Sequence, residues 1–84
     1  MTKTKTTPRA LYTIAQDIQS DWGDRVSYSA VPYLRAMRQL NTMSSPYGVR
    51  DGRHVVMYFL NNAQGWRGDT ARAVKAELRA MLLR

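Results

Sequence analysis

The chain has 84 residues and no cysteine, and its 13 lysine and arginine residues outnumber 6 acidic residues, giving a formal net charge of +7. A chain of this length forms one domain at most and buries only about 60–65% of the surface that its unfolded form exposes, which argues against a deep, enclosed active site. The lack of cysteine excludes a disulfide framework and a thiolate metal site, and the basic balance favours polyanionic partners.

Residues 1–7 are polar, basic and rich in threonine. They lack the apolar stretch of a secretory signal, so we expect a flexible arm ahead of one helical domain over residues 8–84. The longest apolar run, Val55–Leu60, has six residues, whereas a membrane-spanning helix needs about 20. We therefore expect a cytoplasmic protein without a membrane partner.

The first predicted helix covers residues 8–22. Thr7 is a favoured N-cap, and Pro8 is tolerated at the first helical position because its missing N–H has no helical partner there. Gly23 is a natural end, since glycine adopts the left-handed cap conformation without strain. Apolar residues recur at helical spacing on one face: Leu11, Ile14, Ala15, Ile18 and Trp22.

The second predicted helix covers residues 29–41. Either Ser27 or Ser29 is expected to cap it, and Pro32 lies within its first turn. Arg35 and Arg38 are expected to point away from its apolar side. Residues 41–48 then combine asparagine, serine, proline and glycine, a composition that predicts a loop.

The third predicted helix covers residues 51–64, with Gly65 closing it. Val55–Leu60 is apolar almost all round, which is typical of the buried centre of a helical bundle. A strand is the alternative, because valine, tyrosine and phenylalanine favour strands. Asp51 ahead of the run and the continuation through Gln64 favour the helix.

The fourth predicted helix covers residues 68–83, and the short turn before it predicts antiparallel packing against the third helix. One face is apolar: Ala71, Val74, Leu78, Met81 and Leu82. Beside it, Arg72, Lys75 and Arg79 form a basic stripe because residues three and four apart share a helix face. The four helices together predict an all-α, single-domain bundle.

Part of the chain resembles the small basic accessory proteins, of unknown function, that phages of actinobacteria encode. The segment Tyr58–Arg72, continued by Lys75–Leu78, carries the resemblance, and Ser29–Leu34 adds to it. It lies mainly in the C-terminal half. The resemblance implies a phage-encoded protein of the host-cell cytoplasm, and it implies no activity, cofactor or functional residue.

Charge is distributed unevenly along the chain. Residues 31–84 hold nine basic and three acidic side chains, a balance of +6, whereas residues 1–30 hold four and three, a balance of +1. We predict a nucleic-acid-binding surface, with DNA favoured over RNA, because contacts to phosphates dominate nucleic-acid affinity. The candidate residues are Arg67, Arg72, Lys75, Arg79, Arg35 and Arg38. A solvated arginine-rich face that only maintains solubility is the alternative.

The order of the last two helices is also compatible with a helix-turn-helix reader. That match is weak, because Asn61 stands where a small residue normally allows the two helices to approach. A different hypothesis is a protein-interaction module. In it, the apolar third helix binds a host protein or self-associates into a homo-oligomer.

An enzyme is the third hypothesis, and only Asp17, Asp21, Asp24 and His54 motivate it. Because no second acidic cluster exists to complete a coordination shell, we interpret the three carboxylates as the solvated side of a helix. We therefore expect neither catalysis nor a metal or cofactor. Among the aromatic residues, Trp22, Phe59 and Trp66 are expected in the core, and Tyr12 and Tyr47 on the surface, where either could stack on a base or a partner.

Overall fold

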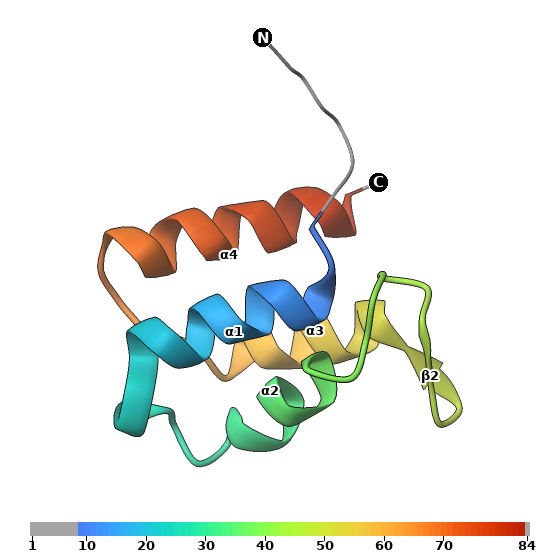
Figure 1. The fold of residues 1–84 in the computed structure, drawn as a ribbon, viewed down its shortest axis with the longest axis horizontal. Coiled ribbons are helices and arrows are strands. Elements are labelled where there is room, and N and C mark those ends of the chain that lie inside the picture. The colour runs from blue at the N-terminus through green and yellow to red at the C-terminus, as the bar shows by residue number, and fades with distance from the viewer. Residues whose placement is uncertain (1–8, 84) are drawn as a thin grey trace, which may run out of the picture.

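The computed structural model describes residues 9–83, and within them the fold is mostly helical. In chain order the elements are α1 (Leu11–Trp22), a short 3-10 helix η1 (Gly23–Arg25), α2 (Val31–Met37), β1 (Pro46–Tyr47), β2 (Arg50–Asp51), α3 (Gly52–Asn61) and α4 (Asp69–Leu82). Figure 1 shows α4 and α2 on opposite sides of α1, with α3 behind α1. The arm predicted for residues 1–7 lies outside the described residues.

The apolar face predicted for the first helix is confirmed. Every residue of that face is buried in α1: Leu11, Ile14, Ala15, Ile18 and Trp22. Gly23 ends α1 as predicted, with a φ of +62° that glycine adopts without a Cβ penalty. The chain then turns through η1.

The first turn of α1 is joined to the segment after α2. The backbone N–H groups of Leu11 and Tyr12 donate to the carbonyl oxygens of Asn41 and Leu40, both at 2.9 Å. These bonds replace a side-chain cap and hold residues 40–41 along α1. The predicted start at residue 8 is therefore wrong, since residues 9–10 are not helical, and Thr7 and Pro8 lie outside the described residues.

The second helix is shorter than the predicted 29–41 at both ends. It begins at Val31, where Ala30 takes the N-cap position without a side-chain hydrogen bond, so neither predicted serine caps it. Pro32 does lie in the first turn, as predicted. The helix ends at Met37, the N–H groups of the next three residues bond back to α2, and the carbonyl oxygens of Leu40 and Asn41 accept from the start of α1.

Part of the predicted loop forms a small antiparallel hairpin. The register pairs Pro46 with Asp51 and Tyr47 with Arg50. Gly48 lies in the turn with a φ of +63°, which favours glycine. Strands of two residues leave no alternating pattern in the sequence, so this hairpin was not predicted.

The apolar run Val55–Leu60 is helical, which settles the choice between helix and strand. The carboxylate of Asp51 caps α3 by accepting from the His54 backbone N–H at 3.4 Å, close to the predicted start of the helix. The helix ends at Asn61 rather than at residue 64. α3 is not the fully buried centre that its apolar run predicted, because Val55, Val56 and Phe59 are buried while Met57 and Tyr58 are 48% and 37% exposed.

Three aromatic side chains form the centre of the core, as predicted. Phe59 is fully buried and meets Trp22 and Trp66 edge-on, with ring centroids 6.3 and 6.5 Å away. Trp22 and Trp66 stack at 5.7 Å. Because Trp66 belongs to the connection between α3 and α4, this cluster anchors the chain where α4 begins.

The last two helices pack antiparallel, as predicted. Arg53, at the start of α3, donates a hydrogen bond to the carbonyl oxygen of Leu82, the last residue of α4. The buried stripe of α4 comprises Ala71, Val74, Leu78 and Met81. A helix-turn-helix motif joins its helices by a turn of about three or four residues, whereas the connection here runs from residue 62 to residue 68. Over residues 9–83, no helix has the length and hydrophobicity needed to cross a membrane.

Candidate nucleic-acid interface

One side of α4 carries a cluster of cations next to the preceding connection. The ammonium group of Lys75 donates to the carbonyl oxygen of Trp66 at 2.6 Å and lies 5.9 Å from the centre of its indole ring. Because Trp66 packs in the aromatic core, its hydrogen bond with Lys75 positions the Lys75 ammonium group beside the connection. The first turn of α4 and the residues before it complete the surface.

Four predicted binding residues line one shallow depression of about 310 Å³ there: Arg67, Arg72, Lys75 and Arg79, with Trp66, Gly68 and Ala71 beneath them. We call these four cations the α4 basic surface. The sequence spacing predicted that the three helical members share a face, and Arg67, also a predicted binding residue, joins them from the connection before α4. This part of the predicted site is thus brought together in space.

The cations of the α4 basic surface are close enough to affect one another. Partial burial lowers the pKa of Lys75, and the positive charges of Arg79 and Arg67 lower it further. Within residues 9–83, the only acid paired with this surface is Asp69, 3.2 Å from Arg72. Both side chains of that pair are largely exposed, so water weakens the attraction. The surface keeps its positive potential.

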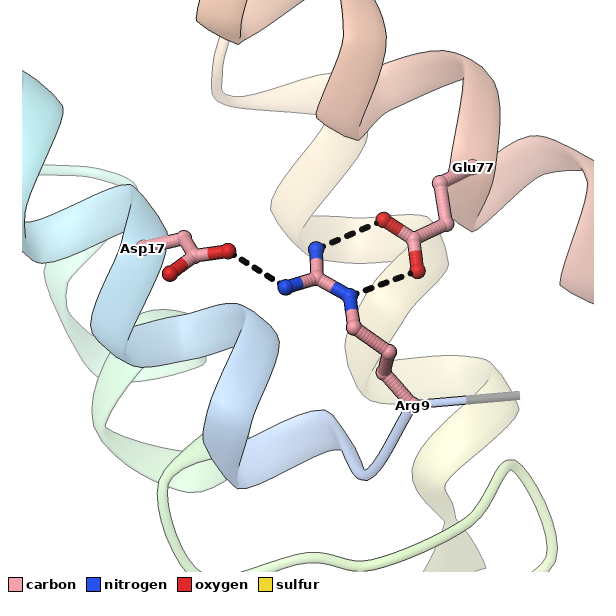
Figure 2. A network of polar contacts seen from close by, with 3 residues as sticks. All are labelled: Arg9, Asp17 and Glu77. Atoms are coloured by element: carbon pink, nitrogen blue, oxygen red, sulfur yellow. Dashed lines mark hydrogen bonds and ion pairs between the residues drawn. The ribbon is translucent and has the colours of Figure 1, made fainter. Parts of the chain in front are cut away.

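On the opposite side of α4, the charged side chains form ion pairs within the chain (Figure 2). The guanidinium of Arg9 binds Glu77 in a bidentate manner, with Nε to Oε2 at 3.0 Å and Nη2 to Oε1 at 2.7 Å. Its Nη1 also donates to Asp17 Oδ2 at 2.5 Å. These bonds to Glu77 and Asp17 raise the pKa of Arg9. The glutamate of α4 is thus engaged away from the α4 basic surface.

Arg35 and Arg38 are not part of that surface. Arg35 lies on α2 and Arg38 directly follows it, and both line a depression between α2 and α1. Because α1 separates α2 from α4 in the fold, the six predicted residues divide into two groups on two sides of the molecule (Figure 1). Sequence spacing along single helices could not reveal this division.

Of the four residues that motivated an enzyme hypothesis, three form polar contacts within the chain, and the fourth, Asp24, lines a depression beside α2. Asp17 binds Arg9, and Asp21 accepts a hydrogen bond from Trp66 Nε1 at 2.8 Å. His54 Nδ1 lies 3.1 Å from the Asp51 carboxylate, and this contact lowers the pKa of Asp51. No group of histidine and acidic residues in the 9–83 range is arranged to hold a metal ion.

Two surface features were not predicted. The ion-pair network of Arg9 joins residues 68 positions apart, for which the sequence carries no local signal. The second is an exposed aromatic cluster, in which the rings of Tyr33 and Tyr58 lie 5.5 Å apart and the Arg50 guanidinium lies 5.8 Å from the Tyr58 ring. The hairpin creates this cluster by bringing Arg50 to α3.

Comparison of the chain with protein-family models, with curated proteins and with solved structures finds no match. The functional interpretation therefore depends on the surfaces described above.

Proposed function

We propose that the protein is a non-enzymatic accessory protein that binds DNA through the α4 basic surface. The observation that carries the proposal is the convergence of Arg67, Arg72, Lys75 and Arg79 on one depression, where three of the four have no acidic partner among the described residues. Cations held in this way attract phosphates and release the counterions condensed on DNA.

The lining of the depression favours contacts to the phosphate backbone of a duplex. Trp66, the aromatic residue of the lining, is 2% exposed, so its ring is not available to stack on a base. Proteins that bind single strands combine a basic groove with exposed aromatic rings. Phosphate contacts alone carry no direct sequence information, so we expect similar affinity for duplexes of different sequence.

The proposal is tested by fluorescence anisotropy with a labelled 20-base-pair duplex between about 50 and 200 mM salt. We expect R67Q/R79Q to weaken binding at least about tenfold and to reduce the slope of log K against log salt by about 2, because two phosphate contacts are removed. The control is R50E, which also lowers the net charge by two. Arg50 lies in the hairpin and does not line the depression.

The control is expected to retain affinity within about threefold, since net charge acts weakly at a distance in salt. Equal losses in R67Q/R79Q and R50E would show that only overall charge matters. Absence of duplex binding at 50 mM salt would contradict the proposal outright.

A second candidate function is protein binding through α3. The exposed Tyr58 and Met57 on α3, with Tyr33 and Arg50 beside Tyr58, favour it, because tyrosine and arginine are enriched at the centres of protein interfaces. Sedimentation of the wild type and of M57S/Y58S tests self-association. This candidate predicts a concentration-dependent oligomer that the double variant loses, and a monomer at all concentrations contradicts self-association.

A further inference from the structure

A second cationic surface lies between α1 and α2. Three neighbouring depressions that share lining residues form it: two, of about 330 and 410 Å³, lie between α1 and α2, and the third, of about 530 Å³, lies against α2 and the residues just before it. The first two share Gln19 and Arg38, and the last two share Val31 and Arg35. We call this continuous surface the α1–α2 groove.

The side chains of the α1–α2 groove suit phosphates. Arg35 and Arg38 are exposed, and neither forms an ion pair with an acidic residue of the described chain. Gln16 and Ser20 add neutral polar groups, while Asp24 is the acidic member of the lining. Tyr28, at one end, is 95% exposed. The groove is therefore more weakly basic than the α4 surface.

A single straight duplex does not reach both surfaces. The described chain measures 38 × 33 × 19 Å, and α1 lies between α2 and α4 (Figure 1). A duplex seated on the α4 basic surface would have to bend around the molecule to meet Arg35 and Arg38, and bending a short duplex costs elastic free energy. Contact with a second duplex avoids this cost.

We infer that the protein bridges two DNA duplexes, one on the α4 basic surface and one in the α1–α2 groove. This inference rests on the proposed function, because the first duplex occupies the surface proposed above. The two guanidinium groups of Arg35 and Arg38 supply the phosphate contacts to the second duplex. Bridging thus needs no second copy of the chain.

The inference is tested with a biotinylated 100-base-pair duplex on beads and a labelled, non-biotinylated duplex in solution, at about 50 mM salt. The amount of protein on the beads reports the first contact, and the label retained reports bridging. We expect wild type and R50E to retain the label, and R35Q/R38Q to retain at least about tenfold less while its own amount on the beads falls by less than about threefold.

The outcomes separate the two proposals. If wild-type protein does not remain on the beads, the proposed function fails and the inference fails with it. If it remains but retains no label, or if R35Q/R38Q retains as much label as wild type, DNA binding stands and bridging through the α1–α2 groove is overturned. Circular dichroism of each variant verifies that these exposed substitutions leave the fold intact.

Discussion

Charged side chains flank α4 on two sides, and they are paired with opposite charges on only one of them. On one side, Glu77 is bound by Arg9, which also binds Asp17, so that opposite charges meet within the chain. On the other side, Arg67, Lys75 and Arg79 lie close to one another without an acidic partner among residues 9–83. Residues only two positions apart in the helix, Lys75 and Glu77, therefore have different environments.

This contrast shows why net charge alone does not locate a binding surface. The charges around Arg9 join the start of the described chain and α1 to α4, and because one cation meets two carboxylates there, this cluster does not attract phosphates. On the α4 basic surface, partial burial lowers the pKa of Lys75 most, and repulsion from the neighbouring Arg79 and Arg67 lowers it further. Phosphates would relieve that repulsion, which is the physical basis of the proposed function.

The largest expected effect is on the free energy of unfolding, from replacing Trp66, which lines the α4 basic surface. Trp66 is buried, stacks on Trp22 and donates to Asp21, so W66A leaves a cavity and an unused acceptor. We expect it to lower the free energy of unfolding by about 3–5 kcal/mol. Urea denaturation measures this, and W66F, which keeps a ring but loses the N–H, is expected to cost about half as much. A cost below about 1 kcal/mol for W66A would contradict the packing described.

The next effect compares the two sides directly. R79E reverses a charge within the α4 basic surface, and we expect it to weaken duplex binding about 100-fold at low salt. E77Q removes a negative charge two residues away on the opposite side, and we expect it to change affinity by less than about threefold. Anisotropy titrations measure both. Similar changes in duplex affinity for R79E and E77Q would show that the two sides of α4 do not differ in DNA binding.

A smaller effect is expected for the ion pairs on the opposite side. R9Q removes the contacts to Glu77 and Asp17, whose side chains are one third to one half exposed. Because solvent screens such pairs, we expect a loss of only about 1 kcal/mol, and less in high salt. A double-mutant cycle of R9Q and E77Q measures the coupling by urea denaturation. Zero coupling at low salt would show that the network of Figure 2 does not stabilise the fold.

The smallest expected effect is on the pH dependence of stability, and it concerns Asp51, which is not on α4. The contact with His54 lowers the pKa of Asp51 in the folded chain. The stabilisation is therefore present above the unfolded value of about 3.9 and is lost as the pH falls through the folded value. D51N does not titrate, so its stability deficit relative to wild type should shrink below about pH 4. A deficit that is constant from pH 6 to pH 2 would contradict this linkage.

Helical periodicity predicted those parts of the fold in which a whole face is buried. The apolar stripes of α1 and α4 and the aromatic core were predictable because burial imposes a regular spacing on these helices. The short α2 was not, because residues 40–41, which follow it, accept backbone bonds from Leu11 and Tyr12, about thirty positions away. The hairpin was missed because its strands are too short for a pattern.

The candidate site was predictable only within one helix. Arg72, Lys75 and Arg79 were expected on one face, and they line one depression. Which side of the bundle Arg35 and Arg38 occupy depends on how α2 packs against α1, and spacing along a single helix carries no information about that. The division of the six predicted residues into two surfaces, and with it the bridging inference, required the structure.

The most direct test of the central claim is an NMR titration of the protein with a 12-base-pair duplex at low salt. We expect the largest amide shifts at residues 67–79 on the side of Arg67, Lys75 and Arg79, together with a rise in the pKa of the Lys75 ammonium as phosphates approach it. Small shifts are expected at Asp17. Shifts centred on the Arg9 network, or an unchanged Lys75 pKa in a saturated complex, would contradict the claim.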